Sequence, residues 1–156
     1  MLVEDQPGVM SKVSGMFSRR GFNIDTISVG KTNTPNVSKM VFTVIGDSRI
    51  IEQVTKQINK LIDVLKVLEF PEDKSIVTEL CLVKVCITDE KAKNELLKYA
   101  EVYHVKVADI TPKSIIFQIV GEPQKIDSFI ELIKQFGIKE ISRTGVTAMA
   151  RGMNGQ

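Results

Sequence analysis

Residues near the start of the chain combine a carboxylate with a turn and a helix start. Asp5 is followed by Gln6-Pro7-Gly8, and from Val9 onward apolar residues recur at helical spacing. The backbone N–H groups of Gly8, Val9 and Met10 could accept a carboxylate, because the first N–H groups of a helix lack partners within it and the helix dipole favours an anion. The Asp5 carboxylate beside them could bind an ammonium group. This chemistry suits an amino acid, although a single motif of this kind is more often an ordinary helix cap and turn.

The sequence contains no recognisable catalytic, metal or cofactor motif. His104, the only histidine, directly follows Tyr103 and is taken as structural, so we expect no Ser-His-Asp triad, Cys-His pair or multi-histidine metal site within one chain. The nucleotide-binding motifs GxGxxG and GxxxxGKS/T are not present. The Asp and Glu residues show no spacing typical of a catalytic pair. We therefore predict no catalytic residues, no metal ligands and no cofactor on this chain.

Composition and charge exclude several classes of partner. The chain has 21 Lys and Arg against 19 Asp and Glu, and its net charge of +2 is too small to indicate binding to nucleic acid or to a membrane surface. No apolar run is long enough to cross a bilayer, and residues 1–5 lack the pattern of a signal peptide, so a cytoplasmic protein is expected. Cys81 and Cys86 lie too far apart on one predicted strand for a disulfide, and both are expected as reduced thiols.

The same order of elements is readable from hydrophobic periodicity on both sides of a polar segment, residues 71–75. The first half predicts strands at 2–4, 22–31, 37–46 and 64–70 and helices at 8–20 and 51–62. The second half predicts strands at 80–87, 105–111, 114–121 and 138–144 and helices at 90–103 and 126–133. Both halves have the order βαββαβ, which predicts an α+β fold of two ferredoxin-like domains in tandem, residues 1–70 and 79–156, with 71–78 as the linker.

Strand faces predict further features of this fold. Residues 40–45 and 115–120 are apolar on both faces, yet a ferredoxin-like sheet carries helices on one face only. Either the two halves pack on each other or the chain forms a sheet-based homodimer, and both can hold. The strand after Gly21 also changes phase near Asp25-Thr26, which indicates a β-bulge there.

Several runs of the sequence closely resemble the small subunits of acetolactate synthase, also called acetohydroxyacid synthase, with their ACT domain. The match is most specific at Glu4-Asp5-Gln6-Pro7-Gly8-Val9, Phe17-Ser18-Arg19-Arg20-Gly21-Phe22-Asn23-Ile24 and Ile27-Ser28-Val29-Gly30. It continues through residues 58–67, 79–85, 143–146 and 150–152, and so covers nearly the whole chain. Members of this family usually have several more residues before the segment that matches Leu2-Val3.

This resemblance implies that residues 1–70 form an ACT domain, which dimerises and binds a branched-chain amino acid between its two copies. It carries over the binding residues Asp5, Gly8, Val9 and Met10 from one subunit and Asn23 and Ile24 from the other. The helix-start amides would take the ligand's carboxylate, the polar Asp5 and Asn23 its head group, and the apolar Val9 and Ile24 its branched side chain.

The same resemblance implies a regulatory subunit that activates a separate large subunit and confers feedback inhibition by valine or a related amino acid. Thiamine diphosphate, Mg²⁺ and FAD are then expected on the large subunit.

Two alternatives stay open. An ACT sensor could serve another enzyme or a transcription factor, although no basic helix-turn-helix is readable. An acylphosphatase-like hydrolase shares the fold, but it needs an arginine in a glycine-rich phosphate loop, and Asp5 puts an anion in that place.

Overall fold

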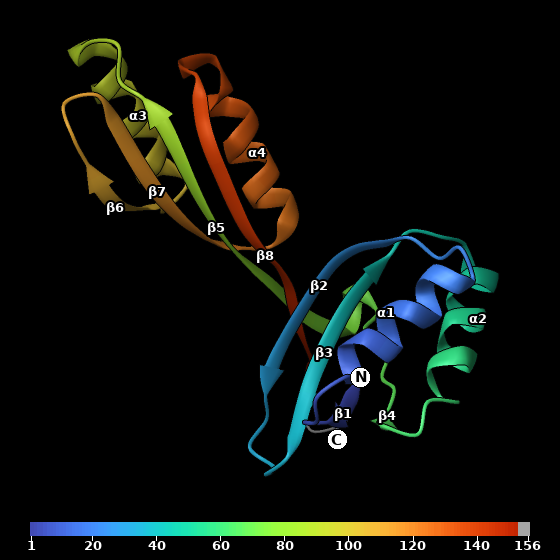
Figure 1. Cartoon of the computed structure of the whole chain (residues 1–156). Coiled ribbons are helices and arrows are strands. Elements are labelled where there is room, and N and C mark those ends of the chain that lie inside the picture. The colour runs from blue at the N-terminus through green and yellow to red at the C-terminus, as the bar shows by residue number, and fades with distance from the viewer. Residues whose placement is uncertain (153–156) are drawn as a thin grey trace. The chain divides into compact units, whose positions relative to one another are not determined.

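The computed structural model describes residues 1–152, apart from the side chain of Glu72. The chain divides into two compact units (Figure 1). The first unit consists of Met1–Ile76 together with the described residues from Val146 onward, and the second of Val77–Gly145. Each unit has a hydrophobic core of its own.

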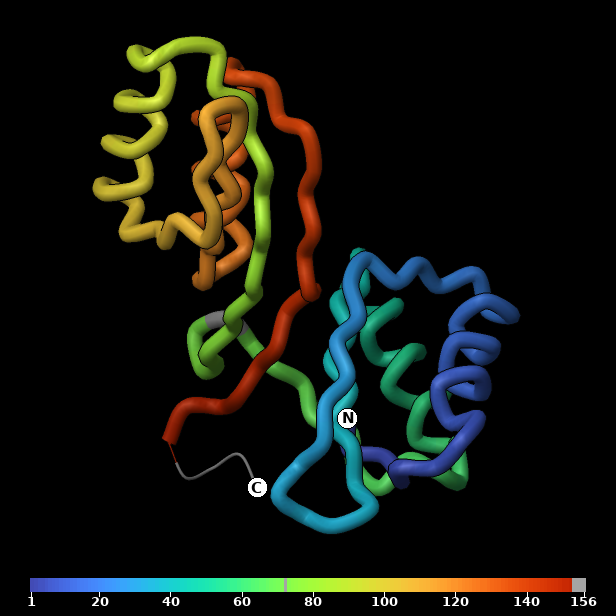
Figure 2. The backbone as a smooth tube through the Cα atoms, turned by 60° about the vertical axis from the view of Figure 1, so that its left-hand side comes forward, coloured from blue at the N-terminus to red at the C-terminus, as the bar shows by residue number. Residues whose placement is uncertain are grey.

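The first unit is an antiparallel sheet with two helices on one side (Figures 1 and 2). Its elements are β1 (Leu2–Glu4), α1 (Val9–Arg19), β2 (Ile24–Lys31), β3 (Val37–Val44), α2 (Ser48–Ile58), β4 (Val64–Lys66) and the short 3-10 helix η1 (Glu72–Lys74). The strand order is β2-β3-β1-β4. The helix α1 forms as predicted, because its apolar residues Val9, Val13 and Phe17 fall on one face and are all buried in the core.

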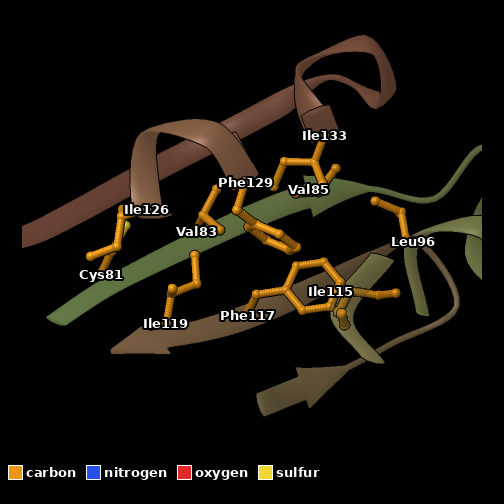
Figure 3. Packing of buried hydrophobic residues seen from close by; sticks show 11 residues of the cluster. Cys81, Val83, Val85, Leu96, Ile115, Phe117, Ile119, Ile126, Phe129 and Ile133 are labelled. Atoms are coloured by element: carbon orange, nitrogen blue, oxygen red, sulfur yellow. The ribbon is translucent and has the colours of Figure 1, made fainter. Parts of the chain in front are cut away.

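The second unit repeats this arrangement. Its elements are β5 (Ser75–Cys86), α3 (Glu90–Val102), β6 (Lys106–Ile110), β7 (Ser114–Gly121), α4 (Pro123–Ile133), the 3-10 helix η2 (Lys134–Phe136) and β8 (Ile138–Ala150), with strand order β6-β7-β5-β8. Figure 3 shows the core, in which Phe117 of β7 meets Phe129 of α4 edge to face, with ring centroids 5.5 Å apart. The prediction of two units with the order βαββαβ and the strand order of a ferredoxin-like sheet is confirmed.

The two units divide the chain differently from the predicted boundaries at 70 and 79. The strand β8 was expected to end at residue 144, but it continues to Ala150, and from Val146 the chain belongs to the first unit. Several hydrogen bonds hold this final segment, two of them from side chains of β2 and β3. Ser28 Oγ donates to the Val146 carbonyl at 2.6 Å, and Lys39 Nζ donates to the Ala148 carbonyl at 2.6 Å.

This segment also explains the apolar outer face of β3. Met40 and Phe42 point into the helix-covered core, so Lys39 and Val41 face the opposite way. Val41 is only 7% exposed. Val146 and Ala148 are buried as well, and the end of β8 therefore supplies cover for this face. The homodimer that the same apolar pattern suggested stays a prediction.

Candidate functional site

The predicted amino-acid site begins at the turn between β1 and α1. The N–H of Asp5 donates to the Asn36 carbonyl at 2.8 Å, which holds the end of β1, and the N–H of Gln6 turns back to the Glu4 carbonyl at 3.0 Å. Gly8 is the N-cap of α1 and has φ 90°, a left-handed value that glycine adopts without strain. It makes no side-chain capping bond. The helix thus starts from an exposed glycine without a side-chain cap.

The first amides of α1 are not equally available. The N–H of Val9 makes a long hydrogen bond of 3.4 Å to the Gln6 carbonyl. Within residues 1–152 no hydrogen bond is found from the N–H of Gly8 or of Met10. These two amides therefore fit the expected carboxylate site best, and the positive end of the helix dipole lies at the same place.

Side chains around the turn have separate roles. Asp5 is exposed and free to meet an ammonium group, and Met10 is 38% exposed at the first turn of α1. The side chain of Val9, expected to contact the ligand's branched side chain, is instead 3% exposed and belongs to the core of the first unit. Only its backbone and the neighbouring Met10 are left to line the site.

Asn23 and Ile24 lie beyond the opposite end of α1. The helix closes with the N–H of Gly21 on the Ser18 carbonyl and the N–H of Phe22 on the Phe17 carbonyl, and Gly21 takes φ 69°. Asn23 is exposed, while Ile24 is half-buried against the core. The structure thus brings Asp5, Gly8, Val9 and Met10 together and places the other two predicted residues apart from them.

The expected bulge after Asn23 is present. The pairing of β2 with β3 shifts register between Ile24 and Thr26, so that Asp25 is the extra residue. Thr43 of β3 stabilises the bulge through its side chain. Its Oγ1 accepts a hydrogen bond from the N–H of Thr26 at 2.9 Å and donates one to a carboxylate oxygen of Asp25 at 3.3 Å. The bulge fixes the strand that follows Asn23 and Ile24.

An ion pair that the sequence analysis missed lies beside the first turn of α1. Lys12 Nζ donates to both carboxylate oxygens of Asp63, at 3.0 and 2.8 Å. Asp63, directly before β4, is buried at 8% exposure. The sequence held one signal of this pair, because Asp63 lies between the apolar residues Ile62 and Val64 at the start of a predicted strand. An aspartate that is buried in such a place usually has a cationic partner.

A second cluster of charged residues lies in the second unit and connects its strands and a helix. Arg143 of β8 forms two hydrogen bonds of 2.7 Å with Glu79 of β5 and one of 2.6 Å with Asp127 of α4. The hydrogen bond with Glu79 raises the pKa of Arg143 above its usual value. Glu79 is 2% exposed, so the pair joins the two strands inside the fold rather than in an open site.

Other chemistry is sparse across the described part of the chain. No group of three or more His, Cys, Asp or Glu residues there could hold a metal ion. Cys81 and Cys86 are both free thiols, as expected, and burial raises the pKa of Cys81. Among residues 1–152, no helix has the length and apolar character needed to cross a membrane.

Two family profiles match the chain, one over each half. The AHAS small subunit-like ACT domain matches residues 1–66, and the small subunit of acetolactate synthase matches residues 78–152. The chain belongs to the acetolactate synthase small subunits. A probable acetolactate synthase small subunit of Methanothermobacter thermautotrophicus is 45% identical over 151 residues, which span 97% of this chain and 90% of the relative. The acetolactate synthase small subunit of Bacillus subtilis is 41% identical over 97% of this chain and 88% of the relative.

A solved structure agrees with this assignment. The crystal structure of the acetolactate synthase small subunit from Thermotoga maritima matches with a TM-score of 0.89 and 41% identity, over 97% of this chain and 94% of that one. At this level of similarity both the fold and the family are shared. The ACT domain that the Asp5-to-Gly8 turn and the Phe17-to-Ile24 run indicated is therefore present in the first unit.

Proposed function

We propose that this small subunit binds the catalytic large subunit of acetolactate synthase, raises its activity, and makes it sensitive to inhibition by a branched-chain amino acid, with valine as the first candidate. The observation that carries the proposal is the uncapped start of α1 at Gly8, in a domain of the ACT family. Such a helix start offers amides to a carboxylate, and it lies next to the exposed carboxylate of Asp5.

The length of α1 supports a site shared between two copies of the chain. Gly8 precedes the helix and Asn23 follows it, and 11 helical residues separate the two ends by about 16 Å. This distance is longer than valine, leucine or isoleucine, so one bound amino acid cannot contact both ends of the same helix. If both groups of residues bind the effector, Gly8 must come from one subunit and Asn23 from its partner.

Each part of a branched-chain amino acid has a matching group in this arrangement. The amides of Gly8 and Met10 would bind the carboxylate, and Asp5 the ammonium group. Asn23 of the partner subunit would add a hydrogen bond to the polar head. Met10 and the partner subunit's Ile24 would contact the branched side chain, since the Val9 side chain is occupied by the core.

The chemistry of the reaction is assigned to the other subunit. Thiamine diphosphate, Mg²⁺ and FAD would be held by the large subunit, which condenses two molecules of pyruvate, or pyruvate with 2-oxobutyrate. The small subunit would contribute no reacting group. Its effect on turnover would arise from a difference in how it binds the large subunit with and without the effector.

A reconstitution with purified subunits tests the proposal. Turnover of the large subunit is measured alone and with increasing amounts of this chain, and then with valine, leucine and isoleucine at saturating small subunit. We expect activation by the chain and inhibition by at least one of the three amino acids. Calorimetric binding of an amino acid without any effect on turnover would instead favour a sensor for another enzyme, and turnover by this chain alone would contradict its assigned role.

A further inference from the structure

We propose that the Lys12–Asp63 ion pair is a positioning device for the effector site, and that it sets where the free amides of Gly8 and Met10 lie. The inference rests on the proposed function, because it names residues that act on the ligand through the first turn of α1. Neither Lys12 nor Asp63 is among the residues expected to touch the amino acid.

The position of Lys12 connects it directly to the site. Its backbone N–H donates to the Gly8 carbonyl at 3.0 Å, which is the first hydrogen bond of α1. Its side chain reaches Asp63 with both carboxylate oxygens at hydrogen-bond distance. Lys12 thus takes part in both contacts, the backbone hydrogen bond that closes the turn over Gly8 and the side-chain contact with Asp63.

The position of Asp63 is fixed by the sheet. Its carbonyl accepts the N–H of Glu4 at 2.9 Å, and Val64, the next residue, pairs with Val3 of β1. Asp63 is thus bound to the same strand whose end carries Asp5. The turn of residues 5–8 is consequently held on both sides, by β1 before it and by the Lys12–Asp63 contact after it.

The burial of Asp63 makes this contact stronger than an ordinary surface pair. The Asp63 side chain is 12% exposed and that of Lys12 is 57% exposed, whereas both partners of the Lys56–Glu52 pair on α2 are more than 60% exposed. A buried carboxylate keeps its cationic partner close, because separation would leave the charge without compensation. The exposed pair on α2, a lysine with a glutamate, provides a control with the same two charges in the same unit.

The fold offers a reason for such a device at this place. Gly8 has no side-chain capping bond, and an added Cβ there would point into open space, with no atom within 4 Å apart from the neighbouring residues. The amides that would bind the carboxylate therefore need support from residues farther along the helix. Lys12 supplies it one turn later.

The test measures effector binding to the full chain by calorimetry for Asp63→Asn, Lys12→Met, Lys12→Arg and the double variant Lys12→Met with Asp63→Asn. We expect each neutral single variant to raise the dissociation constant about fivefold or more, in the range of typical coupling between sites. The double variant should be no weaker than the singles, because all three lack the same ion pair. Lys12→Arg, which can still donate to both oxygens of Asp63, should restore binding to within about twofold.

Controls separate positioning from general stability. Glu52→Gln and Lys56→Met remove the exposed pair and should leave the dissociation constant unchanged, and urea unfolding reports the stability of every variant. Amide hydrogen exchange at Lys12, whose N–H is bonded to the Gly8 carbonyl, should accelerate in Asp63→Asn while exchange in α2 stays the same. If a single variant fails to fold, the double variant, which leaves no charge unpaired, gives the answer.

Two outcomes would overturn the inference in different ways. Unchanged effector affinity in folded Asp63→Asn and double variants, with normal binding by the wild type, would refute the positioning role alone. No binding of valine, leucine or isoleucine by the wild-type chain would refute the proposed function and this inference with it. Losses that multiply in the double variant would show that Lys12 and Asp63 act independently, which also contradicts the proposal.

Discussion

Replacing Gly8 by aspartate should abolish feedback inhibition while leaving activation of the large subunit intact. Gly8 has φ 90°, and a side chain in this left-handed region costs about 1–2 kcal/mol, with less for Asp and Asn than for other residues. An added Cβ would meet nothing within 4 Å, so the fold should tolerate the change. The main effect is therefore expected on the ligand.

The size of that effect follows from the charges. The new carboxylate would lie beside the one that the effector must bring to the amides of α1. Two like charges about 4 Å apart repel by about 4 kcal/mol at an effective dielectric constant of 20, which corresponds to roughly a thousandfold in affinity. Screening by salt and water reduces this figure, so we expect a loss of at least about a hundredfold.

The matched control for this prediction is Gly8→Asn. Asparagine has nearly the shape of aspartate and a similar tolerance for positive φ, but it carries no charge. Turnover of the large subunit with each variant is titrated with valine, leucine and isoleucine. We expect the effector to inhibit the large subunit at lower concentrations with Gly8→Asn than with Gly8→Asp. Inhibition curves for Gly8→Asp that coincide with those of the wild type would refute the placement of the carboxylate.

Three further predictions concern other parts of the chain. Asn23→Ala should weaken effector binding about ten- to a hundredfold by loss of one hydrogen bond to a charged group, and calorimetry showing no change would remove Asn23 from the site. Arg143→Met should lower the free energy of unfolding by about 3 kcal/mol, because it leaves Glu79 buried without a partner. A urea unfolding curve like that of the wild type would count against this. Alkylation of the folded protein should modify Cys86 before Cys81, whose burial raises its pKa and hides the sulfur. Faster labelling of Cys81 would contradict the packing described for β5.

The fold was largely readable from the sequence because its helices and strands follow clean periodicities. The stripe of Val9, Val13 and Phe17 predicted the buried face of α1, and the phase change after Gly21 predicted the bulge at Asp25. The extension of β8 to Ala150 was not predicted, since residues 145–150 are mostly small or apolar, with Thr147 as the one polar residue, and do not alternate between apolar and polar side chains. Their place is set by contacts with Ser28 and Lys39, which are distant in sequence.

The candidate site was predictable only in part. The turn at Gly8 and its uncapped helix start follow from local sequence, because Pro-Gly before an amphipathic run is a local signal. The burial of the Val9 side chain and the pairing of Lys12 with Asp63 depend on tertiary packing, so neither could be derived from spacing. The separation of Gly8 from Asn23 follows from helix geometry once α1 is known to run unbroken between them.

The most direct test concerns the central claim that the amino-acid site is shared between two copies of the chain. It mixes two variants that each bind the effector much more weakly than the wild type does. Gly8→Asp and Asn23→Ala are unfolded together, refolded at equal amounts, and titrated with valine by calorimetry. In a symmetric dimer, a mixed pair carries both changes in one site and none in the other. Random pairing should therefore restore wild-type affinity at about a quarter of all sites, while each variant refolded alone restores none. Refolded mixed dimers that show no recovered binding would contradict the shared site.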